Sequence, residues 1–513
     1  MAASPRNILS SFASTGVFPL NLDIISDDKF ALSCVTGRMI FWKHPLLLRT
    51  MKLFFNVMTN IEKKFKTRFN VEEALHYVLS PCSDSELSDL EDDDTEEPDF
   101  QLERLNDDIV PDIDCSDEDD NVESDNESET DSCIQLIFRW RNKEPPLSNF
   151  EFSGAGFSQS PQCYDEMTPL TFFKLFWDDS ITNTLVGQTN FYSVQKNGKS
   201  MNTNKDEIEK FLGMHMMMSI ILLPAYHMYW AKETRYAPIA DAMPRNRYKQ
   251  LRHFLDANDN TNKDDVANKN NKLLKVQPIL GVRKNCILIE HEEKQSIDEQ
   301  IIPAKTKFSG IRQYNANKPI KWGFKNFVRA GASGMMFDFL MYSGACVNIK
   351  CNGEYVVRKL CETLPKNVNH KLFFDNWFTS LDLCLKLKID GILTTATIRS
   401  NRIKKCPLSA EKELKKKGRG SSCYFTDVNS GLVLVRWFDN KCVQLVSTFS
   451  SPISLSNVKR WNRKNKSYVS VSCPEIVKEY NKSMGGVDLA DMLISLYRTP
   501  IKTKRWYLKV IFH

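Results

Sequence analysis

The sequence predicts a mixed α/β core that follows an all-helical region and an acidic N-terminal segment. Three observations lead to this prediction. Apolar residues recur at helical spacing between residues 168 and 255, strand-length runs such as WGFKNFVRAG appear from about Cys286 onward, and acidic residues gather between Asp84 and Asp131. Of the 513 residues, 42% are hydrophobic, which is enough to form a buried core.

The composition argues against a membrane protein and against a secreted one. The longest apolar run, residues 214–223, is far shorter than the ~18 residues that a membrane span needs. The N-terminus lacks a basic stretch followed by an apolar one, so a secretory signal is not indicated. The 14 cysteines are dispersed without a CxxC pair, which favours a reducing compartment. No structural zinc site is expected.

The N-terminal part divides into residues 1–65, which show no clear period, and residues 66–134. The second part begins with a short amphipathic helix over 66–80 and continues into the acidic tract. Between Asp84 and Asp131 there are 24 Asp or Glu and one Arg, a net charge of −23, so disorder is predicted. The rest of the chain has 68 Lys or Arg and 40 Asp or Glu, a net charge of +28. Charge alone fits both a polyanionic partner and a merely soluble basic surface.

Residues 135–284 are expected to be helical. Thr168 as N-cap and Pro169 in the first turn predict a helix over 168–190. Further helices are predicted over residues 205–223 and 244–255.

Residues 285–400 are expected to form the first part of a mixed sheet, with strand character from Cys286 and a helix that ends at Gly391. Residues 401–473 are predicted to begin as a basic loop, up to residue 420, and to continue as short strands. Residues 474–513 begin with a predicted last helix over 474–498.

Four aspartates lie where a carboxylate could do chemistry. Asp298 lies in a strand-like run, Asp375 follows the apolar HKLFF, and Asp488 and Asp491 are three apart on one helix face. A carboxylate at the end of a buried strand is costly unless it is paired or binds a cation, and Asp oxygens are ligands that Mg²⁺ prefers. Together they suggest a two-metal phosphodiester site. In the alternative interpretation, Asp375 caps the helix over 379–390 and Asp488 is a surface acid.

Several stretches resemble the piggyBac transposase family in family order over residues 135–513. They are EIEKFLGMHMMMSIILLPAYHMYW, MPRNRYKQLRHFLDANDN, SIDEQIIP, NKPIKWGFK, FFDNWFTS and YNKSMGGVDLADMLISLYR. The resemblance implies an RNase H-like catalytic core with an insertion, preceded by a helical dimerisation and DNA-binding domain. It implies metal-dependent cleavage and transfer of DNA strands at TTAA sites, with Mg²⁺ or Mn²⁺ as cofactor.

The resemblance assigns the metal-binding and catalytic carboxylates to Asp298, Asp375 and Asp488, with Asp491 as a further metal-binding acid. It also implies double-stranded DNA as partner, a nuclear location and a homodimer as a further expected assembly. Basic side chains that could contact the phosphate backbone lie in two segments. These are Lys404, Lys405, Lys415, Lys416, Lys417 and Arg419, and then Lys459, Arg460, Arg463 and Lys464. In the alternative interpretation, the cluster over 412–419 is a solvated loop or a nuclear import signal.

Two departures from the family are apparent. The family continues beyond Lys504 into a Cys/His-rich zinc-binding tail, so this chain is expected to be C-terminally truncated and to bind DNA without efficient excision of an element. Residues 7–30 instead resemble the tail of a pogo/jerky-type transposase. The rival hypothesis is therefore a domesticated or decayed DNA-binding protein without catalysis.

Overall fold

The computed structural model describes residues 137–145, 150–154, 167–259, 271–304, 311–315, 320–344, 352–462, 466–499 and 501–513, and the backbone of 31–33 and 39–41. The chain forms two compact units. The first comprises Met1–Leu87 with Gln162–Phe172, and the second comprises Ser88–Pro161 with Phe173–His513. In the first unit, β1 (Ala31–Ser33) and β2 (Met39–Phe41) form an antiparallel pair.

Three predictions lie outside the described residues. They are the resemblance over residues 7–30, the helix over 66–80 and the disordered acidic tract over 84–131.

The helical region of the second unit follows local capping signals. Its elements are α4 (Pro169–Phe176), α5 (Asp179–Asn197), α6 (Lys205–Ile220), η6 (Tyr226–Tyr229), α7 (Ala237–Ala240) and α8 (Arg245–Phe254). Asn204 caps α6 by accepting a 2.9 Å hydrogen bond from the Glu207 N–H. The single helix predicted over 168–190 is wrong, because Asp178 accepts the Ile181 N–H at 3.0 Å and starts a new helix there.

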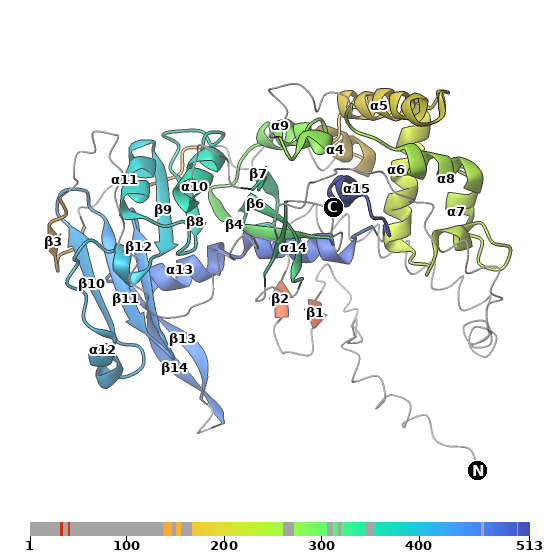
Figure 1. Ribbon diagram of the computed structural model, residues 1–513. Coiled ribbons are helices and arrows are strands. Elements are labelled where there is room, and N and C mark those ends of the chain that lie inside the picture. Colours follow the sequence, from red (N-terminus) through yellow and green to blue (C-terminus); the bar gives the residue numbers. More distant parts are fainter. Residues whose placement is uncertain are drawn as a thin grey trace, which may run out of the picture. The chain divides into compact units, whose positions relative to one another are not determined.

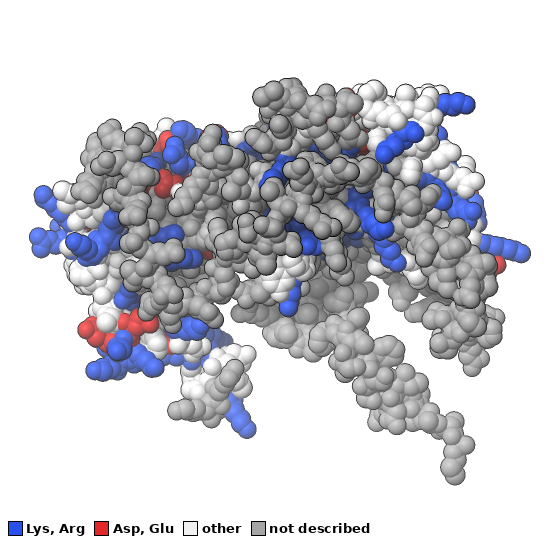
Figure 2. Space-filling view, viewed as in Figure 1, with Lys and Arg blue, Asp and Glu red and all other residues white. Residues whose placement is uncertain are grey.

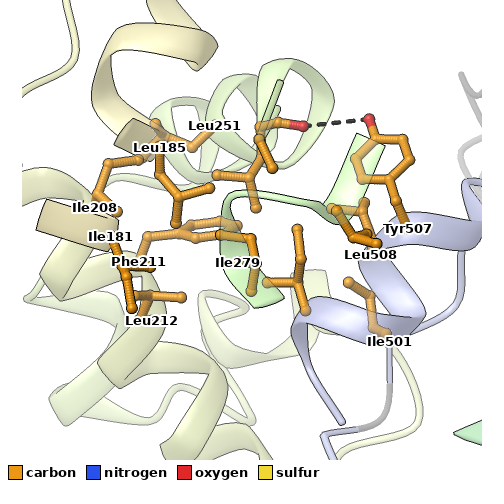
Figure 3. Packing of buried hydrophobic residues seen from close by; sticks show 14 of the residues in the cluster. Ile181, Leu185, Ile208, Phe211, Leu212, Leu251, Ile279, Ile501, Tyr507 and Leu508 are labelled. Carbon is orange, nitrogen blue, oxygen red and sulfur yellow. Dashed lines mark hydrogen bonds between the residues drawn. The ribbon is translucent and has the colours of Figure 1, made fainter. Parts of the chain in front are cut away.

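A continuous apolar core holds these helices together (Figure 3). Ile181 and Leu185 of α5 pack with Phe211 of α6 and Leu251 of α8. The last helix of the chain, α15 (Trp506–Ile511), contributes to the same core, and its Tyr507 hydroxyl donates a hydrogen bond to the Leu255 carbonyl at 3.3 Å. Between α8 and the sheet lie η8 (Leu274–Val276), η9 (Ile279–Gly281) and α9 (Val282–Ile287).

A ten-stranded mixed sheet follows the helical region in the chain. Its strands are β3 (Trp140–Arg141), β4 (Lys294–Pro303), β5 (Arg312–Tyr314), β6 (Trp322–Gly331), β7 (Met336–Met341), β8 (His370–Phe374), β9 (Ile392–Thr397), β10 (Ser422–Asp427), β11 (Val433–Phe438) and β12 (Cys442–Ser447). The order is β3-β10-β11-β12-β9-β8-β4-β6-β5, and β7 also pairs with β6. Only β4–β8 and β8–β9 are parallel. The mixed α/β class is confirmed, but Cys286 belongs to α9, and the strand begins at Lys294.

The two faces of the sheet are covered by different helices (Figure 1). On one face, α10 (Gly353–Cys361) and α11 (Leu381–Ile389) share an apolar core with Ile297, Phe327 and Phe374. On the other face lie α13 (Glu475–Ser483) and α14 (Gly486–Leu496), and Val487 packs on Val328. The single helix predicted over 474–498 is therefore wrong. The helix is interrupted after Ser483, where Met484 and Gly485 separate α13 from α14.

Residues 401–474 extend the sheet and add a separate hairpin. The predicted basic loop contains a helix, α12 (Glu411–Lys417), because Leu414 is buried against the neighbouring strands. After β12, β13 (Leu455–Asn462) and β14 (Ser467–Pro474) form a two-stranded antiparallel hairpin. Among the described helices, none has the length and apolar character that crossing a membrane would require.

Candidate active site and comparison with known proteins

Asp298 and Asp375 lie side by side although 77 residues separate them in the sequence. The strands β4 and β8 run parallel, and Ile297 is paired with Phe374, so the two aspartates are the next residues on adjacent strands. Neighbouring strands lie ~4.8 Å apart. Ile297 and Phe374 both point into the core beneath α10 and α11. Because side chains alternate along a strand, Asp298 and Asp375 both point to the opposite face, where α13 and α14 pack.

The loop after β8 fixes Asp375 from its own backbone. The Trp377 N–H donates to the Asp375 carboxylate at 3.0 Å, and the Thr379 hydroxyl donates to the Asp375 carbonyl at 2.6 Å. The Arg402 guanidinium donates to the carbonyl oxygens of Asn376, Trp377 and Thr379. Burial raises the pKa of Asp375, the Trp377 N–H opposes that shift, and the nearby Glu299 charge adds to it.

The interpretation of Asp375 as a helix N-cap is wrong. The cap of α11 is Ser380, whose hydroxyl accepts the Leu383 N–H at 3.1 Å. The Asp375 carboxylate instead bonds within its own loop and sits partly buried at the sheet surface.

A glycine lets α14 approach the strand that carries Asp298. A Cβ at Gly486 would lie 2.8 Å from the Ser296 hydroxyl oxygen and closer still to the Gly331 carbonyl, so no larger residue fits there. Further along the helix, Asp491 accepts a 2.6 Å hydrogen bond from the Gln300 amide. Ser296, Asp298 and Gln300 share one face of β4, so α14 lies along that face.

Asp488 lies one helical turn before Asp491 on the same flank of α14 and is exposed. Among the residues that the structure describes, no three Asp, Glu, His or Cys side chains are close enough to hold a metal ion. The structure therefore brings Asp298 and Asp375 together, ties Asp491 to Gln300, and leaves Asp488 exposed on the helix that crosses the Asp298 strand. Carboxylates are the donors that a hard divalent cation takes, so the ligand types fit such an ion.

Sequence reasoning missed Tyr480 as a member of this site. Its phenol, on α13, is hydrogen-bonded to Thr397 of β9 and lies within electrostatic range of Asp375 and Asp298. Burial raises its pKa, and the two carboxylates raise it further. Tyr480 opens the stretch YNKSMGGVDLADMLISLYR, so the signal was present, but only the acids of that stretch were considered.

The basic residues predicted to contact DNA fall into two groups. Lys415, Lys416 and Lys417 are exposed in the last turn of α12, and Lys404, Lys405 and Lys459 are exposed as well, with Lys404 3.1 Å from Asp382. Arg419 and Arg460 instead share Asp439 in ion pairs, with the Arg460 contact at 2.9 Å. Arg463 and Lys464 lie outside the described residues. On the face shown in Figure 2, Lys and Arg outnumber Asp and Glu, and the hairpin tip below α12 is basic.

Comparison with known proteins decides the family. Residues 168–513 match the protein family described as Transposase IS4. Human (Homo sapiens) PiggyBac transposable element-derived protein 3 is 31% identical over 350 residues, which cover 66% of this chain and 58% of that protein. The chain belongs to the piggyBac transposable element-derived protein family. The family predicted from the sequence is thus confirmed.

Two further relatives extend the comparison. Human PiggyBac transposable element-derived protein 2 is 28% identical over 358 residues, 67% of this chain and 59% of that protein. The chain thus spans about three fifths of the length of these two curated relatives. A cryo-EM structure of the piggyBac transposase synaptic complex with hairpin DNA shares the fold. Its TM-score is 0.56 at 24% identity, over 69% of this chain and 73% of that one.

Proposed function

We propose that this protein binds double-stranded DNA and cleaves and transfers its strands at TTAA sites, as a piggyBac-type transposase does. The observation that supports the proposal most is the pairing of β4 with β8. It places Asp298 and Asp375 on one face of the sheet, beneath the helices that carry Tyr480 and Asp488.

We assign the centre of the sheet to an RNase H-like core. The strands β7, β6 and β4 are successive antiparallel neighbours, and β8 and β9 continue from β4 in parallel. The order β7-β6-β4-β8-β9 is the arrangement expected of such a core. The strands β10–β14 are inserted between β9 and the helices α13 and α14, which return to the core.

Asp298, Asp375 and Asp488 would hold Mg²⁺ or Mn²⁺. Such ions supply Lewis-acid stabilisation of the attacking and leaving oxygens in phosphodiester chemistry. Asp491 supports this set by holding Gln300, which in turn accepts the Asn326 amide at 3.1 Å. This chain of hydrogen bonds fixes α14 against β4 and β6, and so sets the position of the Asp488 backbone.

The partner proposed from this site is duplex DNA. The exposed lysines at the end of α12 and on β13 offer positive charge without an acidic neighbour in the same turn, and neutralised phosphates release counterions. A DNA substrate places the protein in the nucleus, where the basic α12 segment could also act as an import signal. We further propose a homodimer, which light scattering on the purified chain would detect.

Cleavage of a TTAA-containing supercoiled plasmid by the purified chain tests the proposal. With Mg²⁺ present, Asp298→Asn, Asp375→Asn and Asp488→Asn should each lower strand cleavage by at least about a hundredfold. Affinity for a duplex should stay within about threefold, because none of the three carboxylates attracts phosphate. Asp390→Asn, a surface acid paired with Lys366, is the matched control and should cleave like the wild type. Wild-type cleavage that survives Asp375→Asn would exclude the assigned site.

A second candidate function is DNA binding without catalysis. The exposed position of Asp488, together with the absence of a three-acid group among the described residues, favours it. The same assay separates the two functions. A non-catalytic protein would retard the plasmid in a gel but leave it uncut with Mg²⁺ and with Mn²⁺.

A further inference from the structure

An exposed aromatic pair lies at the end of the β5–β6 ladder. Tyr314 and Trp322 are directly opposite each other in this antiparallel pair, and their ring centroids are 4.8 Å apart. The Arg312 guanidinium lies over the Trp322 ring, 4.1 Å from its centroid. Tyr314 is 37% exposed and Trp322 42% exposed. Two adjacent aromatic rings in water leave a large apolar area uncovered.

The aromatic pair points to the same face of the sheet as Asp298. Trp322, Phe324, Asn326 and Val328 alternate along β6 on one face, and Val328 is the partner of Asp298 on β4. Six residues of strand separate Val328 from Trp322, which is roughly 20 Å, or about six base-pair rises of duplex DNA. A strand of DNA held at Asp298 can therefore reach the aromatic pair.

The row along β6 is covered up to the aromatic pair and not beyond it. Phe324, the next residue of the row, is fully buried and packs edge-on against Trp506 of α15, with centroids 5.7 Å apart. Trp322 and Tyr314 are thus the first members of the row that present their rings to solvent. The pair is an end of the apolar surface, and it is available to a ligand.

The surroundings of the pair are cationic. Between residues 300 and 337 the sequence has seven Lys or Arg and no Asp or Glu. Arg312 supports the pair directly, and Lys321, next to Trp322, is exposed. Exposed aromatic rings within a positive field are the combination that binds unpaired nucleotides, because every base has a π-face and every linkage a phosphate.

We propose that Tyr314 and Trp322, supported by Arg312, form a stacking site for an unpaired DNA base next to the cleavage site. The inference rests on the DNA binding proposed above and adds the state of the DNA that is recognised. A paired base inside a duplex has both faces covered by its neighbours. A base beside a cut, or one turned out of the stack, exposes a face to an aromatic ring.

Binding by the full chain of two labelled DNAs tests the site, one a blunt duplex and the other the same duplex with a short unpaired thymine tail. The wild type should bind the tailed DNA more tightly. Trp322→Ala should weaken binding of the tailed DNA by roughly 5- to 150-fold, the effect of one lost base stack, and leave the blunt duplex within about twofold. Trp322→Phe should restore part of the difference. Trp461→Ala is the matched control, because Trp461 is also exposed and paired with an aromatic ring, Tyr468.

Crosslinking gives a second readout that does not depend on affinity. With 5-iodouracil in the tail, light should attach the tail to the peptide that contains Trp322 or Tyr314. Attachment elsewhere would overturn the site. A tail that adds no affinity in the wild type would also overturn it while leaving the proposed DNA binding intact. Failure to bind either DNA would remove the proposed function together with this inference.

Discussion

The helical region and the central sheet are held together by different chemistry. The core among α5, α6 and α8 is apolar, with Leu185, Phe211 and Leu251 at its centre. Its one buried ion pair among the described residues joins Lys275 to Asp256 at 2.5 Å. The sheet around β4 and β6 instead contains many fully or nearly fully buried polar side chains. These are Gln295, Ser296, Gln300, Asn326, Arg329 and Asp338.

The buried polar groups of the sheet bond to one another. Arg329, with no exposed surface, donates to the Leu360 carbonyl at 2.9 Å, to Thr363 at 2.9 Å, to His291 at 3.2 Å and to Gln295. Hydrogen bonds are directional, whereas apolar packing is tolerant of small shifts. The comparison teaches that the strand carrying Asp298 is fixed by directional bonds, while the helical region is held by burial alone.

The largest effect should come from removing the centre of the polar network. Arg329→Met leaves the buried oxygens and nitrogens around it without their donor, which should lower the free energy of unfolding by about 3–5 kcal/mol. Leu251→Met, a substitution of similar volume in the helical core, should cost less than about 1.5 kcal/mol. Urea unfolding followed by circular dichroism measures both. Equal losses for the two variants would contradict the comparison.

The next effect concerns the close approach of α14 to the sheet. Gly486→Ala places a methyl group against Ser296 and Gly331, which should lower the free energy of unfolding by about 1–3 kcal/mol and reduce strand cleavage by displacing Asp488. Gly485→Ala is the control, because a Cβ there meets none of the described atoms within 4 Å. Thermal unfolding and the plasmid assay report the two effects. A Gly486→Ala variant as stable as Gly485→Ala would show that α14 can shift freely.

A third prediction concerns acid. Burial lowers the pKa of His370 in β8 to about 4 and that of His291 to about 3, whereas an unfolded His titrates near ~6.5. The unfolded chain therefore binds more protons below that pH, so stability is present above ~6.5 and is lost as the pH falls towards the folded pKa values. Between pH 7 and pH 5 each His should cost about 2 kcal/mol.

His370→Asn keeps a donor for the Glu292 carbonyl, which His370 contacts at 3.1 Å, and should reduce the loss between pH 7 and 5 by about 2 kcal/mol. Urea midpoints at pH 8, 7 and 5 measure it, and the interval from 8 to 7 serves as control. An unchanged loss would mean that His370 does not remain neutral in the folded protein.

The smallest effect on stability should come from the exposed lysines of α12. Replacing Lys415, Lys416 and Lys417 by Ala should change the free energy of unfolding by less than about 0.5 kcal/mol. The dependence of duplex affinity on salt should fall by up to about three phosphate contacts. Arg419→Ala should do the reverse, because Arg419 pairs with Asp439 and ties the α12 segment to β13 through Arg460. An unchanged salt dependence in the triple variant would remove α12 from the DNA surface.

The sequence by itself determined the elements whose signals are local. Asn204 and the apolar spacing after it predicted α6, and α8 was predicted to within a residue at each end, because caps and periodicity act within one helix. The breaks at Asp178 and at Met484–Gly485 were missed. A second cap inside an apolar pattern, or two flexible residues, does not interrupt the periodicity that a sequence shows.

Only the tertiary structure decided which polar residues meet. The sequence singled out Asp298 and Asp375 by their type and place, but their adjacency depends on the parallel pairing of β4 with β8 across 77 residues. The same holds for Arg419 and Arg460, which both pair with Asp439. Contacts of this kind depend on how whole strands and helices pack, and a one-residue shift in register would turn either aspartate to the other face.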